Sequence, residues 1–494
     1  MKYMKQIFLI LVAVVAAVSC TDDDSFTTSP NYLLTFTSDT IRMDTVFSRV
    51  PTSRRWFWVC NKSGDGIRCT SVRLANGNQS GFRVSVDGVY LGKESGYQTS
   101  NLEIRNKDSA FVNVELTSPM NHKVGPQLLE DNLVFRLESG VEQKVNLNAY
   151  SWDAEIVKNL VIKGDTTISS DKPIVVYGTM RIDSLASATI VPGTTLYFHS
   201  GAGLDVYGRL SAMGTAEKPI VFRGDRTDKM FDYLPYDMVS GQWNGIRFRS
   251  SSYDNMMLFT DTHGTFNGIV CDSSDVSRLK LNLYNSTVHN CQGYALRSVN
   301  SVVDVRNSQL TNALHDCVAI YGGAALLLHC TIGQFYPFDS NYGAALRFTN
   351  GEVDENGGKH DYPLLQMDCI NSIVTGYAND VVMGEQRDTT VAYTYRFYNS
   401  ILRTDSIKSD DLVKDVIWEC ADSVEVDTVS GGEKNFKLVD RQRQYFDFHL
   451  TDKSRAINAA MTEEGYGLPV DRDGKQRDSK PDIGCYEFVE EPKE

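Results

Sequence analysis

An eight-residue pattern recurs in the second half of the chain and constrains the fold more than any other feature. The pattern reads apolar, polar, apolar, any residue, Asn, Ser, any residue, apolar. Full copies occupy residues 281–288, 303–310, 367–374 and 395–402. A degenerate copy at 326–332 has Cys330 and Thr331 in place of Asn and Ser. A short strand that repeatedly runs into the same turn indicates a chain that winds through similar coils.

The spacing of the copies predicts how these coils stack. Asn285 and Asn307 lie about 22 residues apart, which suits one coil of a β-solenoid. In such a fold each strand pairs with the coils above and below it, so equivalent side chains stack at about 4.8 Å. We therefore predict a parallel β-helix over residues 151–450. The longer steps between some copies would hold insertions.

The Asn of each full copy is the predicted corner of its coil. Asn tolerates the left-handed backbone that a sharp corner needs. Its amide could bond both the backbone and the Asn of the next coil. We therefore interpret these residues as structural, with exposed ligands for a sugar or a metal as the alternative. They are Asn285, Asn307, Asn371 and Asn399.

Two further stretches resemble bacterial right-handed β-helix proteins of the pectate-lyase-like superfamily. The phrase at 190–198 resembles their opening coils, and the tail at 454–487 resembles the closing motif of many of them. Arg455 and Cys485 depart from that motif, which usually has Pro and Ala there. The resemblance implies a right-handed helix with a closing segment at 451–494 that caps its open core. It implies little about activity, because fold alone does not fix function.

Residues 31–150 have a different sequence pattern. Short segments of alternating apolar and polar residues are separated by residues typical of turns. Alternation places one side of a strand in a core and the other in water. About seven or eight such strands suggest a β-sandwich of immunoglobulin-like type, so the whole chain is predicted to be all-β. The sandwich would space the second body from a membrane. Cys60 and Cys69 flank a turn and could form a disulfide. The clearest predicted strands are 56–59, 72–74, 82–86, 111–116, 133–137 and 141–147.

The start of the chain reads as an export signal. Lys2 and Lys5 precede an uncharged apolar run at 7–18. This run is too short for a permanent transmembrane helix, which needs about 20 residues, and it fits the core of a cleavable signal. We therefore predict a signal peptide at 1–19.

The residues around the predicted cleavage point indicate lipid attachment. The segment 17–20 resembles a bacterial lipobox, although Ala17 stands where Leu is usual. The resemblance implies that Cys20 is lipidated and becomes the first mature residue, with an ordinary signal peptide as the alternative. An acidic tether at 20–30 follows, and its aspartates resemble a surface-export signal of Gram-negative lipoproteins. This implies lipid-anchored display on the outer membrane, although the acidic run could simply be solvated.

The charge balance limits the classes of partner. The formal net charge is −14, and removal of the lysine-bearing signal makes the mature chain more negative still. Such a chain repels nucleic acid, whose recognition depends on basic patches. Calcium, cationic groups and neutral glycans remain open as partners.

The sequence shows no recognisable set of catalytic residues. The hydrolases of the β-helix superfamily use grouped aspartates with Gly-His-Gly and Arg-Ile-Lys triplets, and neither triplet occurs here. The histidines are scattered, and we interpret His289 and His329 as exposed coil residues. No Cys/His cluster has the spacing of a transition-metal site. We therefore predict no metal and no cofactor, with calcium left open.

Two long aromatic and acidic insertions, at 225–243 and 335–342, are the best candidates for ligand binding. Long loops on a rigid scaffold often carry function. Aromatic rings stack on sugars, and acids bond hydroxyl groups or calcium. The alternative is that these side chains fold down and cover the coils. The candidate residues are Asp225, Asp228, Asp232, Tyr236, Asp237, Trp243, Arg247, Tyr336 and Tyr342.

Three functions follow from these features. The preferred hypothesis is a non-catalytic surface protein that binds a polysaccharide, a host glycan or extracellular matrix through the β-helix face and loops. The second is a polysaccharide lyase or glycoside hydrolase with an unusual acidic site, which clustering of the loop acids with Arg247 would favour. The third is a structural spacer.

Overall fold

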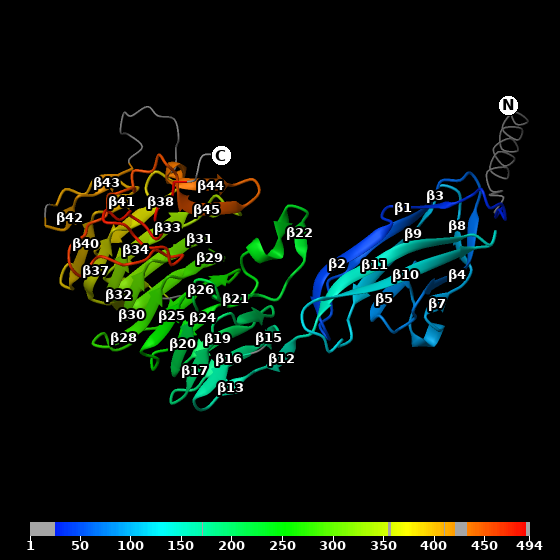
Figure 1. The fold of residues 1–494 in the computed structure, drawn as a ribbon, viewed down its shortest axis with the longest axis horizontal. Coiled ribbons are helices and arrows are strands. Elements are labelled where there is room, and N and C mark those ends of the chain that lie inside the picture. The colour runs from blue at the N-terminus through cyan, green and yellow to red at the C-terminus, as the bar shows by residue number, and fades with distance from the viewer. Residues whose placement is uncertain (1–24, 170, 354–356, 410, 420–431, 491–494) are drawn as a thin grey trace, which may run out of the picture. The chain divides into compact units, whose positions relative to one another are not determined.

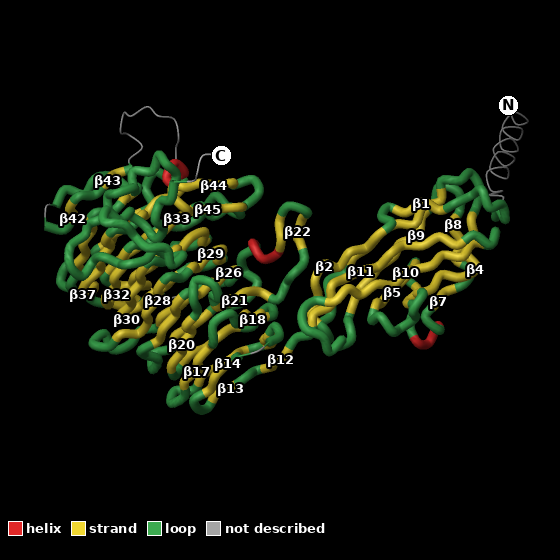
Figure 2. Tube along the Cα trace, viewed as in Figure 1, coloured by secondary structure: helices red, strands yellow, loops and turns green. Residues whose placement is uncertain are grey.

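The computed structural model describes residues 25–169, 171–353, 357–409, 411–419 and 432–490 (Figure 1). The predicted signal peptide and Cys20 lie outside them. Within these ranges the chain is built from strands, with three short 3-10 turns (Figure 2). None of the helices described here is long and apolar enough to cross a membrane. The chain divides into two compact units, Met1–Asp153 and Ala154–Glu494.

The first unit contains two sheets around one hydrophobic core. All six of the clearest predicted strands are strands here, and Phe82–Val86 alternates between buried and more exposed positions along its length. The five-stranded sheet has the order β1 (Leu34–Phe36), β3 (Arg55–Asn61), β9 (Ser109–Leu116), β5 (Phe82–Val86), β6 (Val89–Tyr90). The six-stranded sheet has the order β2 (Thr40–Phe47), β11 (Glu142–Trp152), β10 (Gln127–Leu137), β4 (Ile67–Leu74), β7 (Gln98–Thr99), and β8 (Leu102–Ile104) also pairs with β4.

The disulfide between Cys60 and Cys69 is not formed, and both residues are free thiols. Cys60 lies on β3 of one sheet, whereas Cys69 lies on β4 of the other. Cys69 is fully buried in the core, and burial raises its pKa to about 12. The turn between the two cysteines crosses from one sheet to the other, so the strands are not neighbours in a ladder.

The second unit is dominated by two parallel sheets whose strands alternate along the chain. The 11-stranded sheet comprises β12 (Glu155–Lys158), β15 (Ile174–Tyr177), β18 (Thr195–Phe198), β21 (Ile220–Gly224), β26 (Thr260–His263), β29 (Thr287–Cys291), β31 (Gln309–Ala313), β33 (Thr331–Gln334), β38 (Ile373–Gly376), β41 (Ile401–Leu402) and β43 (Ile417–Trp418). The 17-stranded sheet comprises β13 (Val161–Ile162), β14 (Thr166–Ile168), β16 (Thr179–Ile182), β17 (Ser187–Ile190), β19 (Gly203–Val206), β20 (Arg209–Met213), β24 (Ile246–Phe248), β25 (Asn255–Leu258), β27 (Ile269–Cys271), β28 (Leu279–Tyr284), β30 (Leu296–Arg306), β32 (Val318–Leu328), β34 (Leu346–Thr349), β37 (Leu364–Ile370), β39 (Val382–Glu385), β40 (Tyr393–Tyr398) and β42 (Val413–Lys414). Apolar side chains of both sheets form one continuous core.

Strand register confirms that successive copies of the repeated pattern stack on one another. Asn282 pairs with Asp304, and Asp304 pairs with Leu326 of the degenerate copy. Leu326 in turn pairs with Asp368, and Asp368 with Arg396. Equivalent positions of successive copies are therefore direct neighbours in a parallel ladder.

A buried serine in each full copy ties its coil to the preceding one. The backbone N–H of Ser286 donates to Ser308 Oγ, 22 residues ahead, at 3.2 Å. The same contact joins Ser372 N to Ser400 Oγ at 3.1 Å. A hydroxyl in this position satisfies a backbone donor that would otherwise be buried without a partner. The Ser of the pattern therefore links neighbouring coils by a hydrogen bond.

The degenerate copy is aligned one residue earlier than the sequence suggested. Leu328 pairs with Arg306, which places His329 at the corner and Cys330 at the serine position. His329 has a left-handed φ of 51° and is fully buried, so its interpretation as an exposed residue was wrong. Burial holds its pKa well below the usual range.

The corner asparagines have the left-handed backbone that a corner requires, but their amides do not stack on one another. Asn285 Nδ2 donates to Asp471 O and Asn307 Nδ2 to Val470 O, each at 2.7 Å. Asn371 donates to Met461 O and accepts from Met461 N. These partners lie in the C-terminal segment, and Asn371 Nδ2 also lies 3.0 Å from His329 Nε2 at the corner of the preceding coil. The φ angles are 50° at Asn285, 48° at Asn307, 52° at Asn371 and 43° at Asn399.

The C-terminal segment lies along the coils, which corrects the expectation that it caps an open end. Gly484 N donates to Asn371 O, and Tyr486 Oη donates to Gln309 Oε1 at 2.8 Å. Ile483, Cys485 and Tyr486 share a hydrophobic cluster with β33, β38 and β41 neighbours. The hydrogen bonds from the corner amides of Asn285, Asn307 and Asn371 hold this segment along the coils.

Three antiparallel hairpins interrupt or follow the parallel coils. They are β22 (Lys229–Phe231) with β23 (Leu234–Pro235), β35 (Gly351–Val353) with β36 (Lys359–Asp361), and β44 (Phe436–Asp440) with β45 (Tyr445–Leu450). The last hairpin falls inside the range predicted as β-helix, yet it packs with the C-terminal segment. The 3-10 turns are η1 (Lys93–Ser95), η2 (Tyr236–Met238) and η3 (Glu433–Asn435).

Replacing Asn371 by Ala tests the role of the corner amides. The change leaves the backbone N–H and C=O of Met461 without their partner, which costs about 1–3 kcal/mol. Asn399→Ala is the matched control, because among the described residues its side chain makes no hydrogen bond although its φ is also left-handed. We expect urea unfolding of the second unit to show the larger loss for Asn371→Ala. Equal losses would mean that only the backbone conformation matters.

Candidate functional site

The outward face of the 11-stranded sheet brings together charged side chains from two adjacent coils. On β26 and β29 the residues Thr262 and Val288 point inward and are fully buried. Alternation therefore sends Asp261, His263 and His289 outward. His263 is the direct ladder neighbour of His289.

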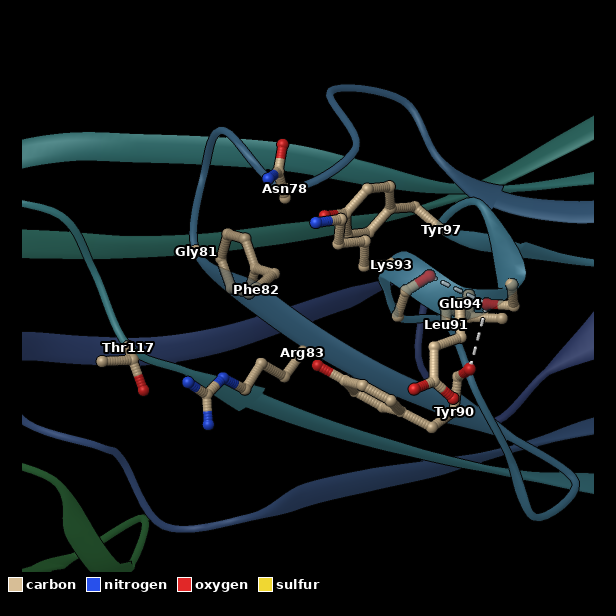
Figure 3. A pocket seen from close by; sticks show the side chains of 12 residues that line it. Asn78, Gly81, Phe82, Arg83, Tyr90, Leu91, Lys93, Glu94, Tyr97 and Thr117 are labelled. Carbon is tan, nitrogen blue, oxygen red and sulfur yellow. Dashed lines mark hydrogen bonds between the residues drawn. The ribbon is translucent and has the colours of Figure 1, made fainter.

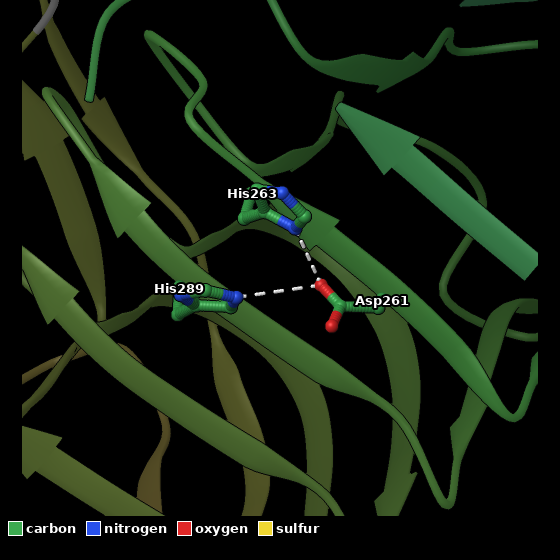
Figure 4. Close-up of side chains that lie close together, drawn as sticks. All are labelled: Asp261, His263 and His289. Carbon is green, nitrogen blue, oxygen red and sulfur yellow. Dashed lines mark hydrogen bonds and ion pairs between the residues drawn. The ribbon is translucent and has the colours of Figure 1, made fainter. Parts of the chain in front are cut away.

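These three side chains converge on one point (Figure 4). Asp261 Oδ1 lies 2.7 Å from His263 Nδ1 and 3.4 Å from His289 Nε2. One ligand atom from each residue lies within 4.8 Å of the others. The His263 side chain is 8% exposed, whereas that of Asp261 is 29% exposed. The group is therefore anchored on a rigid sheet and open to solvent on the carboxylate side.

The insertion after β21 supplies a second carboxylate to this group. Asp237 lies on η2, and its Oδ1 is 2.8 Å from His263 Nε2. The same oxygen is 2.8 Å from Arg223 Nη2. Asn290 Nδ2 holds the insertion by donating to Met238 O at 3.0 Å. His263 is thus fixed between two carboxylates, one on each ring nitrogen.

The carboxylates determine the protonation of His263. Burial lowers the pKa of the imidazole, but Asp261 and Asp237 outweigh this and raise the pKa to about 9. Burial would also raise the pKa of Asp261, yet His263 and His289 hold it well below its usual range. The group is therefore a charged network at neutral pH.

A second His–Asp network lies in the C-terminal part of the chain. His449 Nδ1 contacts Asp447 at 2.5 Å, and His449 Nε2 contacts Asp473 at 2.8 Å. The neighbouring Arg472 donates to Thr287 Oγ1 at 2.9 Å, beside Asp261 in the sheet register. The C-terminal segment therefore reaches the rim of the first network.

The predicted acids do not converge. Asp225 is paired with His199 Nδ1 at 2.7 Å, and Asp228 with Arg226 Nε at 2.6 Å. Asp237 belongs to the His263 network described above, whereas Asp232 is exposed.

Arg247 lies on β24 of the 17-stranded sheet, on a different face from the insertion's acids, and it pairs with Asp272 at 2.9 Å. The clustering that would favour a lyase or hydrolase is therefore not found among the described residues.

Several predicted aromatic ligands are packed into the protein. Trp243 is 1% exposed, stacks on Phe198 at 4.2 Å and donates its indole N–H to His263 O. Tyr336 is buried, and its hydroxyl lies 2.8 Å from Ser240 Oγ. These two residues are corrected from ligand candidates to packing residues, because the insertions fold back onto the coils.

The remaining two aromatic candidates are half-buried. The Tyr236 ring lies under the Arg226 guanidinium, 3.6 Å from it. Burial raises the pKa of Tyr342, with Arg441 and Arg403 nearby opposing this shift. Both side chains are therefore partly buried, and Arg226 covers one face of the Tyr236 ring.

Two other aromatic groups are exposed. Phe231 and Tyr233 on the β22–β23 hairpin stack at 5.6 Å with an interplanar angle of 13°, and their exposed fractions are 55% and 57%. In the first unit, Trp56 and Trp58 flank Phe111 at 5.9 and 4.8 Å on the outer face of the five-stranded sheet. This second group was not predicted as functional, because residues 56–59 have the pattern of an ordinary strand.

A pocket in the first unit lies between β5, β6 and η1 (Figure 3). Its charged side chains are Arg83, Lys93 and Glu94, and Tyr90 lies along one side. None of the residues singled out from the sequence lines this pocket. It combines opposite charges, and no histidine or cysteine is among its lining residues.

The Asp261–His263–His289 group was missed by sequence reasoning. The repeated pattern located His289 on its coil, but the preceding coil has Phe259 and Thr260 where the pattern has Asn and Ser, so it was not recognised as a copy. Without that copy, the register of His263 with His289 could not be read from the sequence. Three residues on two coils therefore appeared scattered.

Comparisons with known proteins add little. No protein-family model matches the sequence, and no curated protein matches it. One similar solved structure is a protein of unknown function from Porphyromonas gingivalis W83, with 14% identity and a TM-score of 0.18 over 27% of this chain and 58% of that one. Another is PapD-like domain 7 of human CEP192, with 14% identity and a TM-score of 0.17 over 26% of this chain and 92% of that one. TM-scores this low support no inference.

The His449 network predicts a pH-dependent stability. Hydrogen bonding to Asp473 and Asp447 raises the pKa of His449 above its usual 6.5, although burial opposes the shift. Its stabilising effect is therefore fully present below pH 6.5 and is lost as pH rises through the raised pKa. Unfolding titrations of wild type and His449→Gln should show a stability difference that shrinks over that window. A pH-independent difference would contradict the assignment.

Proposed function

We propose that this chain is a lipid-anchored protein of the bacterial outer-membrane surface. Its second unit would be a right-handed parallel β-helix of the pectate-lyase-like type, and its first an immunoglobulin-like β-sandwich. The parallel ladders and the shared core support the β-helix, and two sheets around one core support the β-sandwich.

Cys20 would carry the lipid. Cys20→Ala should move the protein from the membrane fraction to the soluble fraction, and unchanged membrane association would refute the anchor.

We propose further that the surface protein binds a neutral polysaccharide or a host glycan through the β22–β23 hairpin. The observation that carries this proposal is the exposed stack of Phe231 and Tyr233. Aromatic faces in water favour the apolar faces of sugar rings, and Asp232 between them offers a hydrogen-bond acceptor. The hairpin projects from the parallel strands in Figure 2, where a polymer could reach it.

The base of the hairpin is held firmly, which favours binding because less freedom is lost on association. Arg226 pairs with Asp228 through two contacts of 2.6 Å and covers the Tyr236 ring. Asp237 is tied to Arg223 and His263. A ligand would therefore meet a preformed aromatic surface.

Trp56, Trp58 and Phe111 form a second candidate glycan surface in the first unit. They lie on rigid strands, and the exposed fraction of Trp56 is 60%. Their position on a flat sheet face suits an extended chain. The experiment below includes a variant that separates this surface from the hairpin.

A glycan array followed by affinity measurements tests the binding function. Phe231→Ala and Tyr233→Ala should each weaken binding of the selected glycan about tenfold, because each removes one stacking face. Phe266→Ala is the matched control, since Phe266 is also exposed in the second unit, at 47%. Loss of binding in Trp56→Ala instead would place the site on the first unit. Absence of binding to any glycan, or product release from one, would overturn the function.

A further inference from the structure

We propose that Asp261, His263 and His289 form a binding site for one divalent transition-metal ion of the zinc class. This site lies at the base of the hairpin, where Asp237 contacts His263, and it was not expected from the sequence. Its three ligand atoms are Asp261 Oδ1, His263 Nδ1 and His289 Nε2. They already lie within 4.8 Å of one another on two hydrogen-bonded strands.

The spacing of these atoms is close to what a zinc ion needs. Zinc–ligand bonds of about 2.0–2.1 Å in a tetrahedron place neighbouring ligand atoms roughly 3.3 Å apart. The Asp261 Oδ1 to His289 Nε2 distance is 3.4 Å, and the contact with His263 Nδ1 is 2.7 Å. Small side-chain rotations would open the shorter contact, and the strand backbones would not move.

The types of ligand decide between classes of metal. Calcium and magnesium prefer sets of oxygen ligands, whereas imidazole nitrogen suits zinc, nickel, copper and iron. Two imidazoles and one carboxylate therefore favour a transition metal over the calcium that the acidic composition left open. The solvent-facing side of Asp261 leaves room for water at the remaining positions.

The surroundings of His263 resemble the outer shell of established metal sites in physical terms. A metal-binding histidine usually donates its other ring N–H to a carboxylate, which fixes the ring and its tautomer. Here Asp237 Oδ1 accepts from His263 Nε2 at 2.8 Å and is itself paired with Arg223. An ion would take the place of the proton that joins His263 Nδ1 to Asp261.

Two arginines, Arg223 and Arg472, lie beside the group. Arg223 is engaged by Asp237, and Arg472 contacts Asp473 at 3.4 Å as well as Thr287. Arg223 offsets the charge of Asp237, so Asp261 is the anionic ligand, and a bound ion would replace the proton between Asp261 and His263.

Titration of the purified full chain with Co²⁺, followed by displacement with Zn²⁺, tests the site. Bound Co²⁺ reports a nitrogen and oxygen ligand set by its visible spectrum. We expect one saturable ion per chain, displaced by Zn²⁺. His289→Gln and Asp261→Asn should abolish the spectrum, and Asp237→Asn should weaken binding about 10–100-fold, as loss of an outer-shell partner does.

His199→Gln is the matched control, because His199, directly after β18 of the same sheet, also pairs with an aspartate at 2.7 Å but, among the described residues, belongs to no His–His–Asp group. It should bind Co²⁺ like wild type. Thermal unfolding in chelator shows whether each variant is folded. The proposal is overturned if wild type shows no saturable binding, or if the spectrum persists in both His289→Gln and Asp261→Asn. In either case the three residues form only a charged hydrogen-bond network.

Discussion

The in-register pairing of successive coils is the constraint on which the rest of the second unit depends. A parallel ladder joins Asn282 to Asp304, and the same strand pairing continues through the later copies. Buried serines such as Ser308 satisfy backbone donors of the preceding coil. Because the side-chain period of a strand is two, a slip of one residue would expose the core and bury the polar face. Register therefore determines both the core and the outer surface.

The outer surface derives its chemistry from this alignment. Residues that are far apart in the sequence, such as His263 and His289, become neighbours because their coils stack. The insertion carrying Asp237 and the C-terminal segment carrying Arg472 then reach the same face. The aromatic hairpin and the charged network meet at Asp237, but Phe231 and His289 belong to one each, so binding of a glycan and binding of a metal can be separated experimentally.

Local patterns in the sequence predicted the strands and corners, whereas contacts between coils were harder to predict. Phe82–Val86 and the left-handed Asn307 follow from alternation and from the backbone preference of Asn. Trp243 was predicted to be a loop ligand because it belongs to a long aromatic and acidic insertion, yet it packs on Phe198. The single-residue shift at His329 arose because sequence similarity aligned Thr331 with Ser, while hydrogen bonding aligned Cys330. Side-chain contacts between coils cannot be predicted until the register of the strands is known.

Cross-linking of cysteines across one ladder step tests the register most directly. Paired residues on neighbouring strands lie about 4.8 Å apart, within the Cα range of about 4.4–6.8 Å for disulfides, whereas diagonal residues are about 7–8 Å apart. Asn282→Cys with Asp304→Cys should therefore oxidise readily to a disulfide identified by peptide mass. Asn282→Cys with Arg306→Cys, the diagonal pair, should not. Equal oxidation of both pairs, or oxidation of the diagonal pair alone, would contradict the stacked-coil account.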